Sequence, residues 1–243
     1  MQTLSKDVLQ DIIQYTYGLG IVDLIKIIGT PQETVINAVA DNRTVIMTGK
    51  FKDPVTEFAS TFGMPNLGKL KLILGFTDEY TDGSKIEVVQ QNGVSSAIHF
   101  ENKTGDFLND YRLMSQSLVD ERIKNTAFKG APWTVSFEAS IVGIQRLKKQ
   151  FSVHSEETSF TTTTANGNLV VDFGDPATHH SNFVFHTGLT GTQKGKLVWP
   201  VKEFLAIMDL PGTKAVSIAE GVMRVSIDSG MAEYEYYILA LAK

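Results

Sequence analysis

The chain of 243 residues contains no cysteine. It therefore has no disulfide framework, no thiol nucleophile and no cysteine-ligated zinc, and we expect a cytoplasmic protein. Long hydrophobic runs are also missing, since no window approaches the ~20 consecutive apolar residues of a membrane helix. The first residues, MQTLSKDVLQDIIQY, lack the basic start and apolar core of a signal peptide. No membrane partner is expected.

Recognisable catalytic motifs are absent as well. The segment 188–196, GLTGTQKGK, does not have the spacing of a phosphate-binding loop, and Gly18-Leu19-Gly20 lacks the third glycine of a dinucleotide site. His180 and His186 would share one face of a strand, but no acidic or cysteine partner stands at metal-ligand spacing. There is no nucleophile elbow. We expect a binding or scaffold protein that is not an enzyme and needs no metal and no cofactor.

Positive charge is scarce, because 22 basic residues stand against 27 acidic ones and give a net charge of −5. This balance excludes a protein that coats nucleic acid over its whole surface, but it permits a local basic surface. The segment 141–151, IVGIQRLKKQF, predicts such a surface on an amphipathic helix. The apolar face holds Ile141, Ile144, Leu147 and Phe151. The opposite face holds Gln145, Arg146, Lys149 and Gln150. A solvated helix often carries such residues, so the segment alone identifies no partner.

The first half of the chain predicts a helix, strands, a second helix and further strands. Ser5 can cap a helix over 4–17, whose polar side, with Asp7, Gln10, Asp11 and Gln14, offers little positive charge. Strands are expected at 21–30, 33–42, 44–51 and 55–62. Pro65 opens a short helix in PNLGKLKLILG, and Asn92-Gly93 marks the turn of a hairpin.

The second half repeats this order of elements. A helix is expected at 139–153, a hairpin turn at Asn166-Gly167 and a helix within WPVKEFLAIMDLPG, followed by strands to the end. Corresponding helices begin about 134 and 135 residues apart, as expected for a diverged structural duplication. We therefore predict an α+β fold with two duplicated domains, 1–115 and 133–243, joined by a linker at 116–132.

This repeated order resembles the DNA polymerase sliding clamps, specifically the two-domain kind that assembles as a trimer. LSKDVLQDII, IVGIQRLKKQF and LPGTKAVSIAEG resemble the corresponding parts of tailed-bacteriophage clamps. DYRLMSQSL and EYEYYILALAK are similar to the end of the first domain and to the terminal strand of the eukaryotic proliferating cell nuclear antigen. The resemblance spans nearly the whole chain, and it rests on the ordered set of motifs.

The resemblance implies a DNA clamp fold, in which helices line the inside of a ring and antiparallel sheets form the outside. Such a processivity factor encircles duplex DNA and tethers the replicative DNA polymerase, here in viral (bacteriophage) DNA replication. The implied partners are two further copies in a homotrimer, duplex DNA, a DNA polymerase and an ATP-dependent clamp loader. DNA contact through a basic channel is expected to be independent of base sequence.

The resemblance also assigns three sets of residues. The DNA-facing set is Lys69, Lys71, Arg146, Lys149 and Lys202. The pocket for partner peptides contains Ile123, Tyr237 and Leu239. The subunit interface pairs 109–115 with 181–187 of the neighbour and includes Tyr111, Leu113, Phe183 and Phe185.

Two other function classes stay open. A structural protein of a virion also multimerises through β-rich domains without an active site. A hydrolase whose catalytic residues are scattered along the chain is the third class. Convergence of the lysines and arginines of the four helices on one concave surface would favour the clamp, since a structural subunit has no reason to gather them.

Overall fold

The computed structural model describes residues 3–124, 128 and 130–242. The chain forms two compact units, and each includes a short segment from the other half of the sequence. Unit 1 consists of Met1–Asp41, Met47–Thr126 and Ser229–Tyr234. Unit 2 consists of Asn42–Ile46, Ala127–Asp228 and Glu235–Lys243. Among the described residues, no helix is long and apolar enough to cross a membrane.

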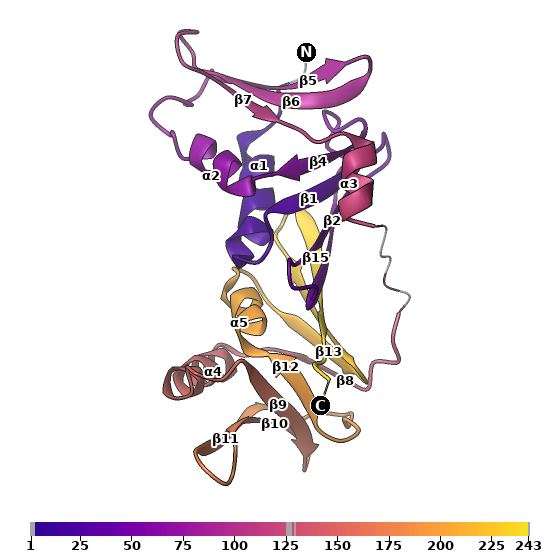
Figure 1. Cartoon of the computed structure of the whole chain (residues 1–243), viewed down its shortest axis with the longest axis vertical. Coiled ribbons are helices and arrows are strands. Elements are labelled where there is room, and N and C mark those ends of the chain that lie inside the picture. Colours follow the sequence, from indigo (N-terminus) through magenta and orange to yellow (C-terminus); the bar gives the residue numbers. More distant parts are fainter. Residues whose placement is uncertain (1–2, 125–127, 129, 243) are drawn as a thin grey trace. The chain divides into compact units, whose positions relative to one another are not determined.

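Unit 1 combines antiparallel strands with three short helices (Figure 1). Its helices are α1 (Lys6–Tyr15), α2 (Leu67–Leu74) and α3 (Gln116–Arg122), and a 3-10 turn, η1 (Tyr17–Leu19), follows α1. Its strands are β1 (Leu24–Gly29), β2 (Thr34–Val39), β3 (Val45–Phe51), β4 (Thr61–Pro65), β5 (Lys85–Gln91), β6 (Val94–Glu101) and β7 (Leu108–Arg112). Strands occur in the orders β4-β1-β2-β3 and β5-β6-β7, so β7 lies at a sheet edge.

Unit 2 repeats this plan (Figure 1). Its helices are α4 (Ile141–Val153) and α5 (Val201–Asp209). Its strands are β8 (Val135–Glu138), β9 (Ser159–Ala165), β10 (Asn168–Gly174), β11 (His180–Thr187), β12 (Leu197–Pro200), β13 (Ala215–Ala219), β14 (Val222–Asp228) and β15 (Ala232–Leu239). Strands occur in the orders β11-β10-β9-β12 and β15-β14-β13-β8, so β11 lies at a sheet edge. The predicted α+β fold class with antiparallel sheets is confirmed.

Helix α1 begins as predicted, because the Ser5 hydroxyl accepts a hydrogen bond from the Asp7 N–H at 3.2 Å. Its predicted apolar face is buried. The placement of Asp11 on the polar face is wrong, since its carboxylate is buried and accepts a 2.7 Å hydrogen bond from the Tyr234 hydroxyl. The Tyr234 ring stacks on Tyr15, which widens the buried side of the helix beyond the aliphatic stripe.

Residues 55–60 are not the strand that the sequence predicted. Strand β4 begins only at Thr61, and before it the chain turns so that Phe58 is buried. Gly29 makes this path possible, because a Cβ there would lie 1.4 Å from the Phe58 carbonyl oxygen. Helix α2 is confirmed, but Pro65 ends β4, and Asn66 with φ of 55° makes the transition into the helix.

Helix α3 occupies the start of the segment that was predicted as a linker. Val119 is buried within the helix and Ile123 directly after it, and Lys26 forms an ion pair with Asp120 of α3 at 2.5 Å. Gly63 leaves the space that Val119 fills, since a Cβ on Gly63 would lie 2.9 Å from a Val119 methyl group. Two buried residues in a polar segment give too weak a periodicity to predict a helix.

Both predicted hairpin turns are confirmed. Asn92 and Gly93 have φ of 53° and 77°, and Asn166 and Gly167 have φ of 49° and 73°. Positive φ at both central residues is the type I′ geometry, which Asn-Gly adopts most readily. The turns join β5 to β6, whose register shifts once between Val89 and Gln90, and β9 to β10, whose register is continuous.

Candidate nucleic-acid interface

Helix α4 begins at a local cap and packs directly on the edge strand β11. The Ser140 hydroxyl accepts a hydrogen bond from the Gly143 N–H at 3.0 Å. Gly143 is buried, and a Cβ at this position would lie 2.5 Å from the carbonyl oxygen of Phe185 in β11. The glycine, unfavourable within a helix, therefore allows a close approach of helix and strand.

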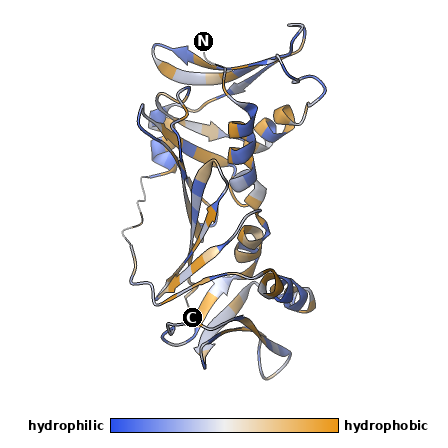
Figure 2. Ribbon diagram, turned by 180° about the vertical axis from the view of Figure 1, so that it is seen from behind, coloured by the Kyte–Doolittle hydropathy of each residue, from blue (hydrophilic) through white to orange (hydrophobic). Residues whose placement is uncertain are grey.

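The apolar face of α4 is narrower than the sequence predicted. Leu147 is buried, whereas Ile144 and Phe151 are half-buried. Ile141 is 75% exposed, and it is the first residue of the helix, two residues before the contact of Gly143 with β11. Hydrophobic and hydrophilic residues alternate along the helix (Figure 2), and Val142 and Val153 are exposed as well.

The cationic face of α4 is solvent-exposed, as expected. Arg146, Lys148 and Lys149 are exposed, and Lys148 forms an ion pair with Asp209 of the neighbouring helix α5. Within the described part of the chain, no acidic side chain pairs with Arg146, Lys149 or Lys202, the exposed lysine of α5. These three side chains can therefore meet an external anion without first losing an ion pair.

In unit 1 the predicted DNA-facing lysines lie on α2, which contacts α1. Lys69 and Lys71 are exposed, and the Lys71 ammonium lies 5.6 Å from the centre of the Tyr17 ring. The exposed residues Gln10 and Gln14 of α1 are neutral. Each unit therefore has two contacting helices, and the exposed cations named by the sequence lie on α2, α4 and α5.

The two strands predicted to form the subunit interface are both sheet edges. Tyr111 of β7 is buried, which raises the pKa of its hydroxyl, and this hydroxyl donates a 2.5 Å hydrogen bond to the Pro65 carbonyl. Leu113 and Phe183 are half-buried, whereas Phe185 is buried. Their side chains therefore contribute to the packing of each unit, and an external partner would meet the open backbone groups of these strands.

Tyr237 lies in an aromatic cluster of unit 2. Its ring stacks on Phe128 at 4.3 Å, and Phe128 stacks in turn on Trp133 at 5.8 Å. Burial, followed by a hydrogen bond to Glu235, raises the pKa of Tyr237 to about 12. The pocket predicted from the sequence does not include Trp133, although tryptophan at the start of a domain after a polar segment is a usable signal for a binding cluster.

The other two residues predicted for the partner pocket differ in exposure. Leu239 of β15 is 38% exposed. Ile123 is buried at the end of α3 and belongs to unit 1, whereas Tyr237 belongs to unit 2. The structure therefore surrounds Tyr237 with residues of its own unit, Phe128 and Trp133 among them.

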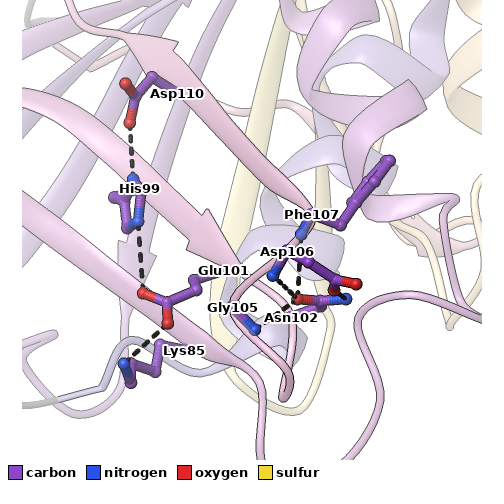
Figure 3. A network of polar contacts seen from close by, with 8 residues as sticks. All are labelled: Lys85, His99, Glu101, Asn102, Gly105, Asp106, Phe107 and Asp110. Atoms are coloured by element: carbon purple, nitrogen blue, oxygen red, sulfur yellow. Dashed lines mark hydrogen bonds and ion pairs between the residues drawn. The ribbon is translucent and has the colours of Figure 1, made fainter.

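A polar ladder crosses one face of the β5-β6-β7 sheet (Figure 3). Lys85 pairs with Glu101 at 2.9 Å, and His99 lies 3.7 Å from Glu101 and 2.8 Å from Asp110 of β7. The hydrogen bond to Glu101 raises the pKa of Lys85 and lowers that of Glu101. The ladder joins neighbouring strands on the sheet surface, and each carboxylate in it lies beside a lysine or a histidine.

The histidines do not assemble into a metal site in the part of the chain that the structure describes, where no group of three potential ligands is found. His180 binds Asp172 at 3.2 Å, and His186 stacks on Phe137 at 4.6 Å. Both side chains have partners within unit 2.

Comparison with protein-family models and with curated proteins finds no match. Solved structures do match, over nearly the whole chain. One is the PCNA of A. fulgidus with the C-terminal region of FEN-1 bound, at 11% identity, with 99% of this chain and 97% of that chain covered and a TM-score of 0.69. Another is the PCNA from Thermococcus kodakaraensis, at 12% identity, with 98% and 97% covered and a TM-score of 0.69. At these identities the likeness shows the clamp fold.

Proposed function

We propose that this protein is a sliding clamp that encircles duplex DNA and tethers a DNA polymerase during processive synthesis. The observation that supports this most directly is that Arg146, Lys149 and Lys202 are exposed and form no ion pair with the described acidic residues, in a chain of net charge −5. Lys69 and Lys71 on α2 extend the set to unit 1. The clamp fold is the scaffold for this role, and in the proposal its two duplicated domains are those that the sequence predicts, 1–115 and 133–243.

The mechanism is topological rather than enzymatic. Duplex DNA carries one charge per roughly 1.7 Å of its axis, so lysine and arginine side chains can follow the phosphates without reading bases. Arg146, Lys149, Lys202, Lys69 and Lys71 form these contacts in the proposal. A closed ring prevents dissociation, and weak, sequence-independent contacts permit sliding.

Ring closure would join the open edge of β7 to the open edge of β11 in a neighbouring copy, and three such contacts make a homotrimer. The support is that both strands lie at sheet edges. Unpaired strand edges offer rows of backbone donors and acceptors for such pairing. An ATP-dependent loader would open and close the ring on DNA.

Partner proteins would dock at a site on unit 2 that includes Tyr237 and Leu239. One of the similar solved structures has the C-terminal region of FEN-1 bound to its PCNA. Replacing the half-exposed Leu239 by alanine should weaken binding of the polymerase's clamp-binding peptide about tenfold in calorimetric titration, because an apolar anchor is lost. Leu118→Ala, at another exposed leucine, is the matched control. Equal affinity of the Leu239 variant and wild type would remove Leu239 from the site.

The type of replication system stays a prediction from the sequence. The motifs shared with tailed-phage clamps favour a viral clamp that acts in the host cytoplasm. Testing the chain with the polymerase and loader encoded beside it would identify the system.

The decisive experiment combines solution mass with DNA retention. The proposal expects three chains per particle, and a particle that a matching loader places on nicked circular DNA and that leaves after the circle is cut. Equal retention on circular and linear DNA contradicts encirclement. A virion subunit would instead form larger assemblies without any need for a loader.

A further inference from the structure

The open edge of β7 has a helix beside it. Helix α2 contacts β7, and the Phe76 ring, directly after α2, packs edge-on against Phe107 at the start of β7 with 5.8 Å between ring centres. Phe76 is nevertheless 39% exposed. A large, partly exposed apolar side chain therefore lies beside the beginning of this edge strand.

The open edge of β11 has the same arrangement. Helix α4 runs antiparallel to β11, because Gly143 near its start lies against Phe185, whereas His154 at its end hydrogen-bonds Ser181 at 2.9 Å. Val142, next to Gly143, is 56% exposed. At about 100° per residue it falls close to Arg146, whose guanidinium reaches the Val184 carbonyl at 3.3 Å. Val142 therefore stands on the β11 flank of α4, near the end of the strand.

The backbone determines which faces of the two strands match. In β7 the Leu113 N–H donates to Ser96 of β6, so by strict alternation the open backbone groups belong to Asp110 and Arg112. In β11 the Val184 carbonyl is open to Arg146, so even-numbered residues again supply the open groups from His180 to Val184, before the β-bulge that follows Val184. Side chains of odd-numbered residues, such as Tyr111 and Ser181, face the helices.

Pairing these edges places both helix-covered faces on the same side of the joined sheet, since directly opposite residues in a ladder share a face. Antiparallel pairing also sets the start of β7 opposite the end of β11. Phe76 stands at the first of these ends and Val142 at the second.

We propose that Val142 of one copy packs against Phe76 of a second copy, as an apolar contact that flanks the strand pairing. The inference rests on the proposed ring and names two side chains at its subunit contact. The partner is another copy of this chain, because Phe76 lies beside the open edge of β7 and Val142 lies beside the open edge of β11, and these two edges pair in the proposed ring. Val153, exposed at the opposite end of α4, lies beside the wrong end of β11 for this contact.

Because the chain has no cysteine, single cysteines can be introduced and the contact can be measured by cross-linking them. Phe76→Cys and Val142→Cys are prepared separately, mixed at equal concentration and treated with a short bis-maleimide. The mixture should give about tenfold more two-chain product than a mixture of Phe76→Cys with Val153→Cys, the matched control, because proximity in the ring raises the effective concentration. Thr77→Cys, at the exposed next residue, replaces Phe76→Cys if the latter does not fold.

The outcomes separate the two proposals. A wild-type protein that stays monomeric in sedimentation overturns the ring and the contact together. A trimer in which the Val142 and Val153 mixtures cross-link equally overturns the contact and leaves the ring intact. Both the ring and the contact are supported by a trimer that cross-links selectively through the cysteine at position 142. In that case Val142→Glu should weaken trimer assembly about tenfold, whereas Val153→Glu should not.

Discussion

Asp11 is a buried carboxyl group with a stabilising donor, Tyr234, and burial is the largest cause that raises its pKa. A group whose pKa is higher in the folded protein contributes stability that is complete below its unfolded pKa and lost as pH rises through the folded pKa. Asparagine at this position does not titrate, so the stability of Asp11→Asn should rise relative to wild type as the pH increases above the unfolded pKa of about 4. Urea unfolding across this range measures the difference, with the exposed Asp7→Asn as control. Parallel curves for Asp11→Asn and wild type would contradict the prediction.

Arg146 and Lys149 are exposed and lie away from the core of α4. Replacing both by glutamate should leave the fold intact and weaken DNA binding. The slope of log affinity against log salt concentration should fall in magnitude by about 2, one for each lost phosphate contact. Fluorescence anisotropy over a salt series measures this slope. The control variant, Lys50→Glu with Lys103→Glu, makes the same charge change at exposed positions outside the helices. An equal loss of DNA affinity in the control would show that net charge causes the effect, and not the position of the two residues on α4.

Helices α2 and α4 each contain a glycine, and the surroundings of the two glycines differ. Comparing alanine substitutions at Gly68 and Gly143 therefore tests how tightly α4 packs against β11. Alanine favours a helix over glycine by about 1 kcal/mol. At Gly68 of α2 the added Cβ meets the mobile end of Tyr17 at 3.0 Å, whereas at Gly143 of α4 it meets the Phe185 backbone at 2.5 Å. Gly143→Ala should therefore destabilise the protein by about 1–3 kcal/mol, more than Gly68→Ala. Thermal unfolding measures the order, and equal stability of the two variants would show that α4 can move away from β11.

At the scale of the whole molecule, the open edge of β7 offers a sharper test of assembly than its buried residues do. The Arg112 side chain is exposed and its backbone N–H points to the open edge, whereas Tyr111 is needed in the core of unit 1. Arg112→Pro should leave unit 1 folded and weaken self-association about tenfold or more, because proline removes a ladder donor. Sedimentation of this variant beside Arg112→Ala measures the effect. A trimer of unchanged stability in the proline variant would place the interface elsewhere.

The sequence predicts the elements that have local signals and misses those that depend on tertiary contacts. Ser5 and Ser140 mark helix starts, and two Asn-Gly pairs mark turns, because each acts within a few residues. Strands β8 and β12 are four residues each, too short for a recognisable alternation. For the candidate site, the exposed cations of α4 follow from periodicity, but the contact of Gly143 with a distant strand does not.

The hydrogen bond from Arg146 to the Val184 carbonyl gives one side chain two competing uses. In the proposed clamp, a phosphate that draws the guanidinium away leaves this carbonyl to a neighbouring strand, so DNA binding and ring closure become thermodynamically linked. Linkage is reciprocal, and closure then raises the affinity for DNA by the same factor. A hydrogen bond to a charged group contributes at most about 1.5–3 kcal/mol, so the coupling cannot exceed roughly a hundredfold. A ring assembled without DNA would already have this cation released towards its channel.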